Sequence, residues 1–365
     1  MVIYFLLIAF VLVCPTIMEH FNTESEKKRK WVVIISVGAI YLLCALKSTD
    51  VGIDIPGYQK AYIQAGQHGW FDTSYIYFEK GYIFIEKLFN ILGFSFQTYL
   101  AVIYAIVFIP VGIFIYKYSS NVTISCVVYI CYQILVFNIS GIRQSIATSM
   151  CLVAYMCLDK KKFESMIEFV VIVLMATQVH RSAIIFLLAF FARKMKLNVP
   201  FLGGTLIFFL GSLMFRSNIV TYLNQYAGKY QAGEEMTLGG NFTFLLATML
   251  LLLFLFFVYH KELFTEGVEA QGSRYYCTDE FATSTIIMIT FTVIAQLVLN
   301  GGLLRGANYY SVFMILAIPD ISMYFDSKSE KIYNALIVIF MIILFYTQTL
   351  SINQFNCVPY RFFWQ

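Results

Sequence analysis

The chain has 365 residues, of which 60% are hydrophobic and 13% are charged, and its mean hydropathy is +0.75. This composition excludes a soluble globular protein. The net charge is only +4 and no basic patch is interleaved with aromatic residues, so we expect no nucleic-acid binding.

Apolar runs of membrane-spanning length recur along the chain, which predicts an all-α polytopic membrane protein with a single transmembrane domain over residues 1–365. About twelve transmembrane helices are expected. Their expected ranges are 2–13, 31–46, 99–116, 122–137, 144–158, 163–179, 182–192, 199–215, 242–259, 281–300, 306–319 and 332–349. Lys and Arg gather in cytoplasmic loops. The Lys-Lys-Arg-Lys run at 27–30 therefore places the loop after the first span in the cytoplasm and the N-terminus outside. Twelve spans return the C-terminus to the same outer side.

Two segments are expected on the outer face, at residues 47–98 and 216–240. The first begins with a loop in which Asp54 belongs to a turn-forming stretch, although a plain solvated loop explains that stretch equally well. It continues with a short helix at 82–96. Because this helix carries Glu86 and Lys87, an amphipathic helix at the membrane interface fits it better than a span. Glu79 precedes the helix, and helix capping is an alternative role for its carboxylate.

Three arginines interrupt apolar sequence and are predicted at outer turns: Arg143, Arg181 and Arg305. An ionisable group at membrane depth is costly and usually faces a protein interior or a water-filled cavity. Arg143 could instead reach a phospholipid headgroup. The short return leg at 182–192, about 17 Å long at helical rise, places Arg181 and His180 below the outer surface.

Guanidinium groups that converge on one cavity form a clamp for a phosphate or diphosphate, because each presents a planar fork of N–H donors. Arg305 follows two glycines that allow close approach of a ligand to the backbone. His180 titrates near neutrality and suits a proton acceptor, although a lone histidine is often a satisfied buried group. Aromatic residues of the outer segment either form an interfacial belt or stack on sugar faces.

Eight cysteines lie mostly inside apolar runs without CxxC pairing, and no Asp-rich signature accompanies the arginines. We therefore expect no metal and no cofactor.

The order of these residues resembles the EpsG-type branch of the Wzy polysaccharide polymerases. The resemblance covers almost the whole chain. It is carried by Lys47, Val51-Gly52-Ile-Asp54, Tyr58, Glu79-Lys-Gly81-Tyr82, Asn138, Ile142-Arg143-Gln144-Ser-Ile-Ala147, Val179-His180-Arg181-Ser182-Ala183, Arg305, Tyr309-Tyr310, Ile318-Pro319 and Pro359-Tyr360.

The resemblance implies a fold related to the GT-C-like membrane glycosyltransferases and a site in the bacterial inner membrane that faces the periplasm or exterior. The implied activity joins undecaprenyl-diphosphate-linked oligosaccharide repeats into O-antigen or capsule. Membrane lipids and a chain-length regulator are the implied partners.

On this interpretation the reaction is metal-independent glycosyl transfer, which needs a base at the acceptor and charge stabilisation at the leaving diphosphate. We expect Arg143 and Arg305 to bind the diphosphate, with Arg181 as a helper. The base is expected to be His180, Asp54 or Glu79, and the sequence does not choose among them. The residues expected at the sugars are Tyr58, Gln144, Tyr309 and Tyr360.

Two other functions use similar features. A ligase that moves finished glycan to another acceptor would use the same cavity. A transporter or flippase of lipid-linked oligosaccharide would favour inverted repeats and broken helices in both halves. We find no such repeat in the sequence.

Overall fold

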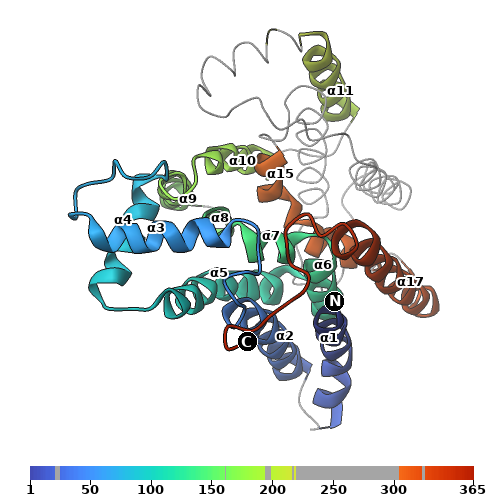
Figure 1. The fold of residues 1–365 in the computed structure, drawn as a ribbon. Helices are drawn as coiled ribbons and strands as arrows, with labels where there is room; N and C mark the ends of the chain where they lie inside the picture. The colour runs from blue at the N-terminus through green and yellow to red at the C-terminus, as the bar shows by residue number, and fades with distance from the viewer. Residues whose placement is uncertain (21–24, 161, 194–198, 216–217, 219–303, 323–324) are drawn as a thin grey trace. The chain divides into compact units, whose positions relative to one another are not determined.

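The computed structural model describes residues 1–20, 25–160, 162–193, 199–215, 218, 304–322 and 325–365 (Figure 1). Over these ranges the chain is helical with no strand, and it contains one isolated β-bridge, between Lys47 and Phe362. It forms two compact units, residues 1–187 with 331–365, and residues 188–330. The expected spans at 242–259 and 281–300 and nearly all of the loop at 216–240 lie outside the described residues.

The first unit contains most of the described helices. These are α1 (Val2–His20), α2 (Ser25–Ala45), α3 (Ile55–Gln67), α4 (Lys80–Ile91), α5 (Phe96–Tyr118), α6 (Val122–Cys131), α7 (Ile134–Ser140), α8 (Ile142–Cys157), α9 (Phe163–Thr177), the 3₁₀ segments η1 (Leu158–Lys160) and η2 (Arg181–Leu187), most of α17 (Ser327–Phe345) and the π-helical η5 (Tyr346–Leu350). The second unit holds α10 (Leu188–Ala192), α11 (Val199–Met214), α15 (Leu304–Ser311) and α16 (Met314–Ile321).

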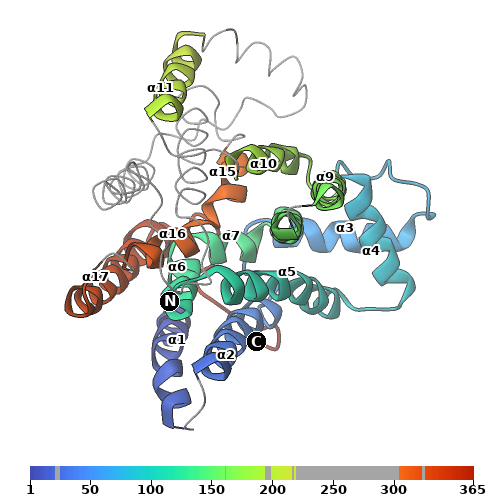
Figure 2. The same cartoon turned by 180° about the vertical axis from the view of Figure 1, so that it is seen from behind.

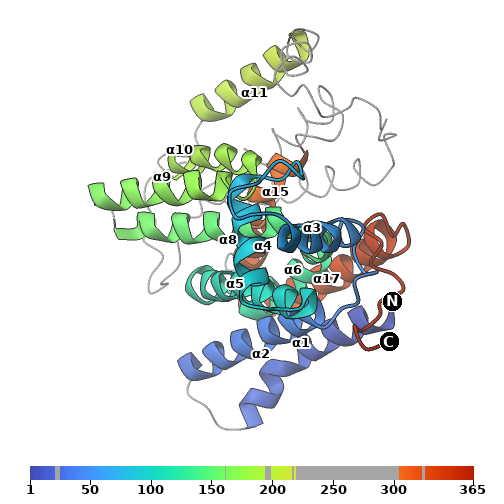
Figure 3. The same cartoon turned by 60° about the vertical axis from the view of Figure 1, so that its left-hand side comes forward.

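In the first unit, α8 packs against both α5 and α9, and α2 packs against α1 and α5 (Figures 2 and 3). Large aromatic side chains fill this core, and Tyr99, Tyr104, Tyr129 and Tyr155 are almost wholly buried. Their hydroxyls find partners inside: that of Tyr104, for example, donates to the Ile139 carbonyl at 3.1 Å. A buried hydroxyl without a partner would be destabilising, so these bonds allow tyrosine in an apolar core.

Several helices are apolar, as expected for a polytopic membrane protein. Three described segments are long and apolar enough to cross a membrane: Val2–Glu19, Phe96–Tyr118 and Ser327–Leu350. A fourth is the bent pair α6 and α7, whose axes differ by 54°. The total of about twelve spans stays a prediction.

The predicted continuous span at 122–137 is wrong in one respect, because the structure breaks it into α6 and α7. Gln133 has φ of 62°, a left-handed conformation that interrupts the helical hydrogen-bond ladder. The expected span at 306–319 is likewise divided between α15 and α16. The expected leg at 182–192 begins as the 3₁₀ segment η2 rather than as an α-helix.

The outer segment contains a helix, α3, where the sequence favoured a loop. Its Asp, Pro and Gly residues are typical of turns, but Pro56 lies in the first turn, where proline needs no hydrogen-bond partner. The buried residues Ile55, Tyr58, Ala61, Tyr62 and Ala65 recur at helical spacing. The predicted amphipathic helix is present as α4, which ends at Ile91.

The C-terminal tail packs along the chain that follows α2. The Ser48 N–H donates to the Arg361 carbonyl at 2.8 Å, and the Tyr4 hydroxyl donates to the Cys357 carbonyl at 2.9 Å. Lys47 lies wholly buried beneath this tail, where it donates to the Val51 carbonyl at 2.8 Å. Burial lowers the pKa of Lys47 to about 7. The tail is therefore part of the packed first unit.

Candidate functional site

The Glu79 carboxylate joins three segments of the first unit. Its Oε2 accepts a hydrogen bond from Nη1 of Arg143 at 2.5 Å, and its Oε1 accepts one from the Arg181 backbone N–H at 3.1 Å. Nδ1 of His180 lies 3.9 Å from the same Oε1. Glu79 and His180 are buried, with 9% and 7% of their surface exposed. The predicted residues Glu79, Arg143 and His180 therefore lie in one desolvated cluster.

The docking of α4 explains how Glu79 reaches His180. The Tyr82 N–H donates to the Gln178 carbonyl at 3.3 Å, so the first turn of α4 lies directly against the end of α9. A Cβ on Gly81 would lie 2.7 Å from that same carbonyl oxygen, closer than real contacts allow. Glycine at position 81 is thus required by this close approach, which brings the residue before α4 to the residues that follow α9.

Arg143 lies in the first turn of α8, directly after the bend at Gly141. A positive charge is unfavourable at a helix N-terminus, so its position needs a compensating partner. Glu79 supplies that charge, and the guanidinium packs over the rings of Phe78 at 4.0 Å and Tyr58 at 5.9 Å. Such cation–π contacts are strongest where water is excluded. Arg143 Nε has no hydrogen-bond partner among the residues that the structure describes.

The turn that holds Asp54 lies beside the end of α7. Gly52 has φ of 107°, and a Cβ there would lie 2.8 Å from the Ile139 carbonyl oxygen, so only glycine fits. The Asp54 N–H donates to Ser140 Oγ at 3.2 Å. The Asp54 side chain itself is exposed, unlike Glu79 and His180.

Tyr58 belongs to the cluster, because its ring lies beneath the Arg143 guanidinium at 5.9 Å. Burial raises the pKa of Tyr58, and the positive charge of Arg143 opposes that rise. Gln144, the next residue of α8, is buried. Arg181 contributes its backbone N–H to Glu79 while its side chain is exposed.

The remaining predicted residues belong to the C-terminal tail or to the second unit. Tyr360 belongs to the C-terminal tail, and its hydroxyl donates to the Leu43 carbonyl at 2.6 Å. Tyr309 is buried in α15 of the second unit. Arg305 also belongs to α15, but its side chain lies outside the described residues. The two-arginine clamp of Arg143 and Arg305 therefore stays a prediction.

Two residues of this region were not predicted as site residues. Phe78 covers the Arg143 guanidinium. Glu86 is wholly buried, and neither carboxyl oxygen has a hydrogen-bond partner within the described part of the chain. Burial raises the pKa of Glu86 to about 8, although Tyr82 and Arg143 oppose the rise. The sequence signal that could have identified Glu86 is its spacing of seven residues from Glu79. At helical periodicity this spacing places the two carboxylates on the same side of the chain.

The cluster has the components of a site that binds an anion and moves a proton. Arg143 offers N–H donors in a fork that matches phosphate oxygens. Glu79 faces His180 and can orient its ring, as carboxylates do for catalytic histidines. No group of three or more potential metal ligands occurs in the described ranges.

The fold and the site together define an apolar, helical membrane protein with a desolvated arginine, carboxylate and histidine near the end of a helix. The EpsG family model matches residues 30–362, so the chain belongs to the EpsG family. The resemblance in the sequence is thereby confirmed, and family membership indicates a polysaccharide-polymerase type of function. Comparisons with curated proteins and with solved structures gave no match.

Proposed function

We propose that this protein joins undecaprenyl-diphosphate-linked oligosaccharide repeats into O-antigen or capsular polysaccharide at the outer face of the bacterial inner membrane. The observation that carries the proposal is the convergence of Arg143, Glu79 and His180 in one desolvated cluster. Family membership supports the polymerase class. The lipid carrier is what the resemblance to the family implies, and the charge bias in the sequence supports the outer face of the membrane.

In the proposed reaction, a sugar hydroxyl of one lipid-linked repeat attacks the anomeric carbon of the growing chain. A new glycosidic C–O bond forms and the C–O bond to the diphosphate breaks, so the diphosphate leaves with the electron pair. The hydroxyl proton passes to a base. Arg143 stabilises the charge on the leaving diphosphate through guanidinium N–H groups that Glu79 does not use. A preorganised donor of this kind typically contributes a few kcal/mol in a water-excluded site.

The contacts favour His180 as the base. Glu79 already accepts hydrogen bonds from Arg143 and from the Arg181 N–H, so both of its carboxylate oxygens are engaged by donors of the protein. The exposed Asp54 side chain lacks an orienting partner among the described contacts. His180 is buried and held between Glu79 Oε1 and Ser182 Oγ, the latter 3.2 Å from Nδ1. Glu79 is then the residue that orients the imidazole.

The test is polymerisation by purified protein in detergent, with a chemically defined undecaprenyl-diphosphate-linked repeat as the only glycan. We expect a ladder of products that grow by one repeat at a time and release of undecaprenyl diphosphate. A transporter would form no new glycosidic bond. A ligase would attach finished chains to an added acceptor without lengthening them.

The base assignment has a matched control in the same protein. His180→Gln should reduce the polymerisation rate by roughly 10²–10⁴-fold, the usual contribution of general base catalysis. His68→Gln should leave the rate unchanged, because His68 is exposed and pairs with Asp72 in the loop between α3 and α4. Equal rates for His180→Gln and the unmodified protein would remove His180 from the reaction.

A further inference from the structure

The polarity of α4 is inverted relative to a helix at the surface of a soluble protein. Beyond the first turn, where Lys80 is exposed, its charged residues Glu86 and Lys87 point inward, with 0% and 2% of their surface exposed. Its outward residues Leu88 and Ile91 are apolar and exposed to 48% and 71%. A helix that turns its charges inward and its apolar residues outward is typical of contact with lipid.

The outward residues form one continuous stripe. Phe84, Leu88 and Ile91 recur at intervals of four and three residues, which places them on one face of the helix. Leu92, directly after the helix, extends the stripe and is 57% exposed. We call these four residues the α4 apolar face. These four residues are uncharged, and the exposed Lys80, one turn before Phe84, lies at the N-terminal end of the same side of the helix.

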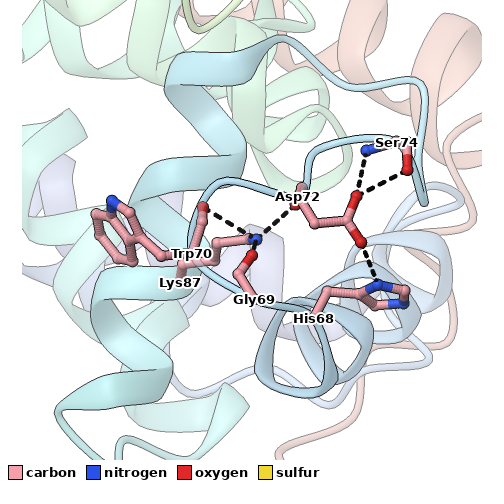
Figure 4. A network of polar contacts seen from close by, with 6 residues as sticks. All are labelled: His68, Gly69, Trp70, Asp72, Ser74 and Lys87. Carbon is pink, nitrogen blue, oxygen red and sulfur yellow. Dashed lines mark hydrogen bonds and ion pairs between the residues drawn. The ribbon is translucent and has the colours of Figure 1, made fainter.

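Lys87 satisfies three backbone carbonyls of the loop that precedes α4. Lys87 Nζ donates to the carbonyl oxygens of Gly69, Trp70 and Asp72, with distances of 3.2 Å to Trp70 and 2.5 Å to Asp72 (Figure 4). Unpaired carbonyls are expensive in a lipid environment. Lys87 therefore satisfies, from inside the protein, three carbonyls that would otherwise need solvent.

One aromatic residue of this loop, Trp70, lies beside the α4 apolar face. The Trp70 ring packs on Phe84 with centroids 5.5 Å apart, and its indole points away from the Lys87 network (Figure 4). Phe71 is 88% exposed. Tryptophan and other large aromatics are favoured where acyl chains meet headgroups. The loop thus extends the apolar surface with residues suited to the membrane interface.

The chain connectivity places this surface next to the bilayer. Only residues 92–95 separate α4 from α5, and α5 is one of the helices long and apolar enough to span a membrane. Four extended residues reach at most about 14 Å. On α3, which packs against α4, the polar residues Lys60 and Gln67 are exposed, and Ile63 between them is 55% exposed. The exposed surface of α3 is therefore mixed, whereas the α4 apolar face is wholly apolar.

From this arrangement we propose that the α4 apolar face, with Trp70 and Phe71, lies against the acyl chains of the bilayer leaflet in which α5 begins. The partner is the lipid surface itself. The α4 helix then lies along the membrane with Lys87 and Glu86 turned into the protein, and α3 lies between α4 and water. This orientation places the Glu79 end of α4 at the lipid boundary.

The test uses tryptophan fluorescence in lipid nanodiscs. In a background with Trp31, Trp70 and Trp364 replaced by Phe, one tryptophan is introduced on the α4 apolar face as Leu88→Trp, or in the control as Lys60→Trp on α3. Phosphatidylcholine brominated on its acyl chains should quench Leu88→Trp several-fold more than Lys60→Trp. Aqueous iodide should show the reverse order.

Two results would overturn the proposal. Iodide quenching of Leu88→Trp equal to that of Lys60→Trp, without bromolipid quenching, would place the face in water. Quenching by neither reagent would mean that protein, such as a second copy, covers it. Ile91→Trp repeats the measurement on the same face, so a folding defect at one position does not remove the test. No readout depends on glycosyl transfer, so the result is independent of the proposed function.

Discussion

The Glu79 carboxylate and the Arg143 guanidinium form a hydrogen-bonded ion pair of 2.5 Å between residues that are 64 positions apart in sequence. Both side chains are largely desolvated, with 8% and 16% of their surface exposed. Burying two charges is costly, and their attraction roughly offsets that cost when the geometry is good. Retaining such a pair is therefore weak evidence for stabilisation and fits a role in binding or catalysis.

Removing the carboxylate should destabilise the protein. Glu79→Gln leaves Arg143 without its countercharge, and breaking a buried pair typically costs about 3–5 kcal/mol. Glu168→Gln is the matched control, because Glu168 pairs with Lys160 on the surface, where such pairs contribute about 0–1 kcal/mol. Denaturation of both variants in detergent measures the difference. Similar small losses would contradict a desolvated pair at Glu79.

Enlarging the residue at position 81 should separate α4 from the end of α9. Gly81→Ala places a Cβ 2.7 Å from the Gln178 carbonyl oxygen, so the backbone must shift and the contact between Glu79 and His180 must loosen. We expect lower activity and lower stability, the latter by about 1–3 kcal/mol as for other overpacked sites.

Gly57→Ala is the comparison for that substitution. Gly57 lies inside α3, and a Cβ added at this position would meet no atom within 4 Å. Alanine there should be neutral or stabilising by about 0.5–1 kcal/mol, because it restricts the unfolded chain. Equal unfolding temperatures for the two alanine variants would argue against the close approach at Gly81.

The buried Glu86 predicts a specific dependence of stability on pH. Folding raises its pKa from 4.5 to about 8, so the native state favours the protonated carboxyl. Its contribution is fully present below about pH 4.5 and is lost as the pH rises through about 8. Unfolding temperatures measured from pH 5 to pH 9 should therefore fall, and the fall should be shallower in Glu86→Gln. Parallel curves would show that Glu86 is not buried in its neutral form.

Substitution of Tyr360 distinguishes a structural role of this residue from sugar binding. Tyr360→Phe removes the hydrogen bond to the Leu43 carbonyl and should lower stability by about 1 kcal/mol. If the contact is structural, the polymerisation rate per folded molecule should stay unchanged. A large loss of rate at unchanged stability would instead support the predicted contact with sugar.

Much of the helical order follows from the sequence because long apolar runs leave the backbone few alternatives to a helix in a membrane. The positions at which these helices are interrupted do not follow from the sequence in the same way. The left-handed Gln133 interrupts an apolar run that carries no glycine or proline at that point. The α3 helix was missed because Pro56 and Gly57 are typical of turns, while its stability comes from tertiary burial of Tyr58 and Tyr62.

The candidate site was predicted in part. A charged residue within apolar sequence is conspicuous, so Arg143 and Glu79 could be selected individually. The approach of Glu79 to His180 depends on the close packing of Gly81 against Gln178, a contact between residues far apart in sequence. The inward direction of Glu86 and Lys87 could not be predicted either, because helical spacing defines faces but does not state which face meets lipid.

The most direct test of the account is the polymerisation rate of purified Arg143 variants with the lipid-diphosphate-linked repeat. Removing one preorganised charge donor typically costs about 3–4 kcal/mol of transition-state stabilisation. Arg143→Gln should therefore lose at least a hundredfold in kcat, and Arg143→Lys should recover only part of it, because lysine lacks the planar fork of donors. Folding of each variant is verified by its elution in detergent. Long polymer made at the unmodified rate by folded Arg143→Gln would contradict the central role assigned to this arginine.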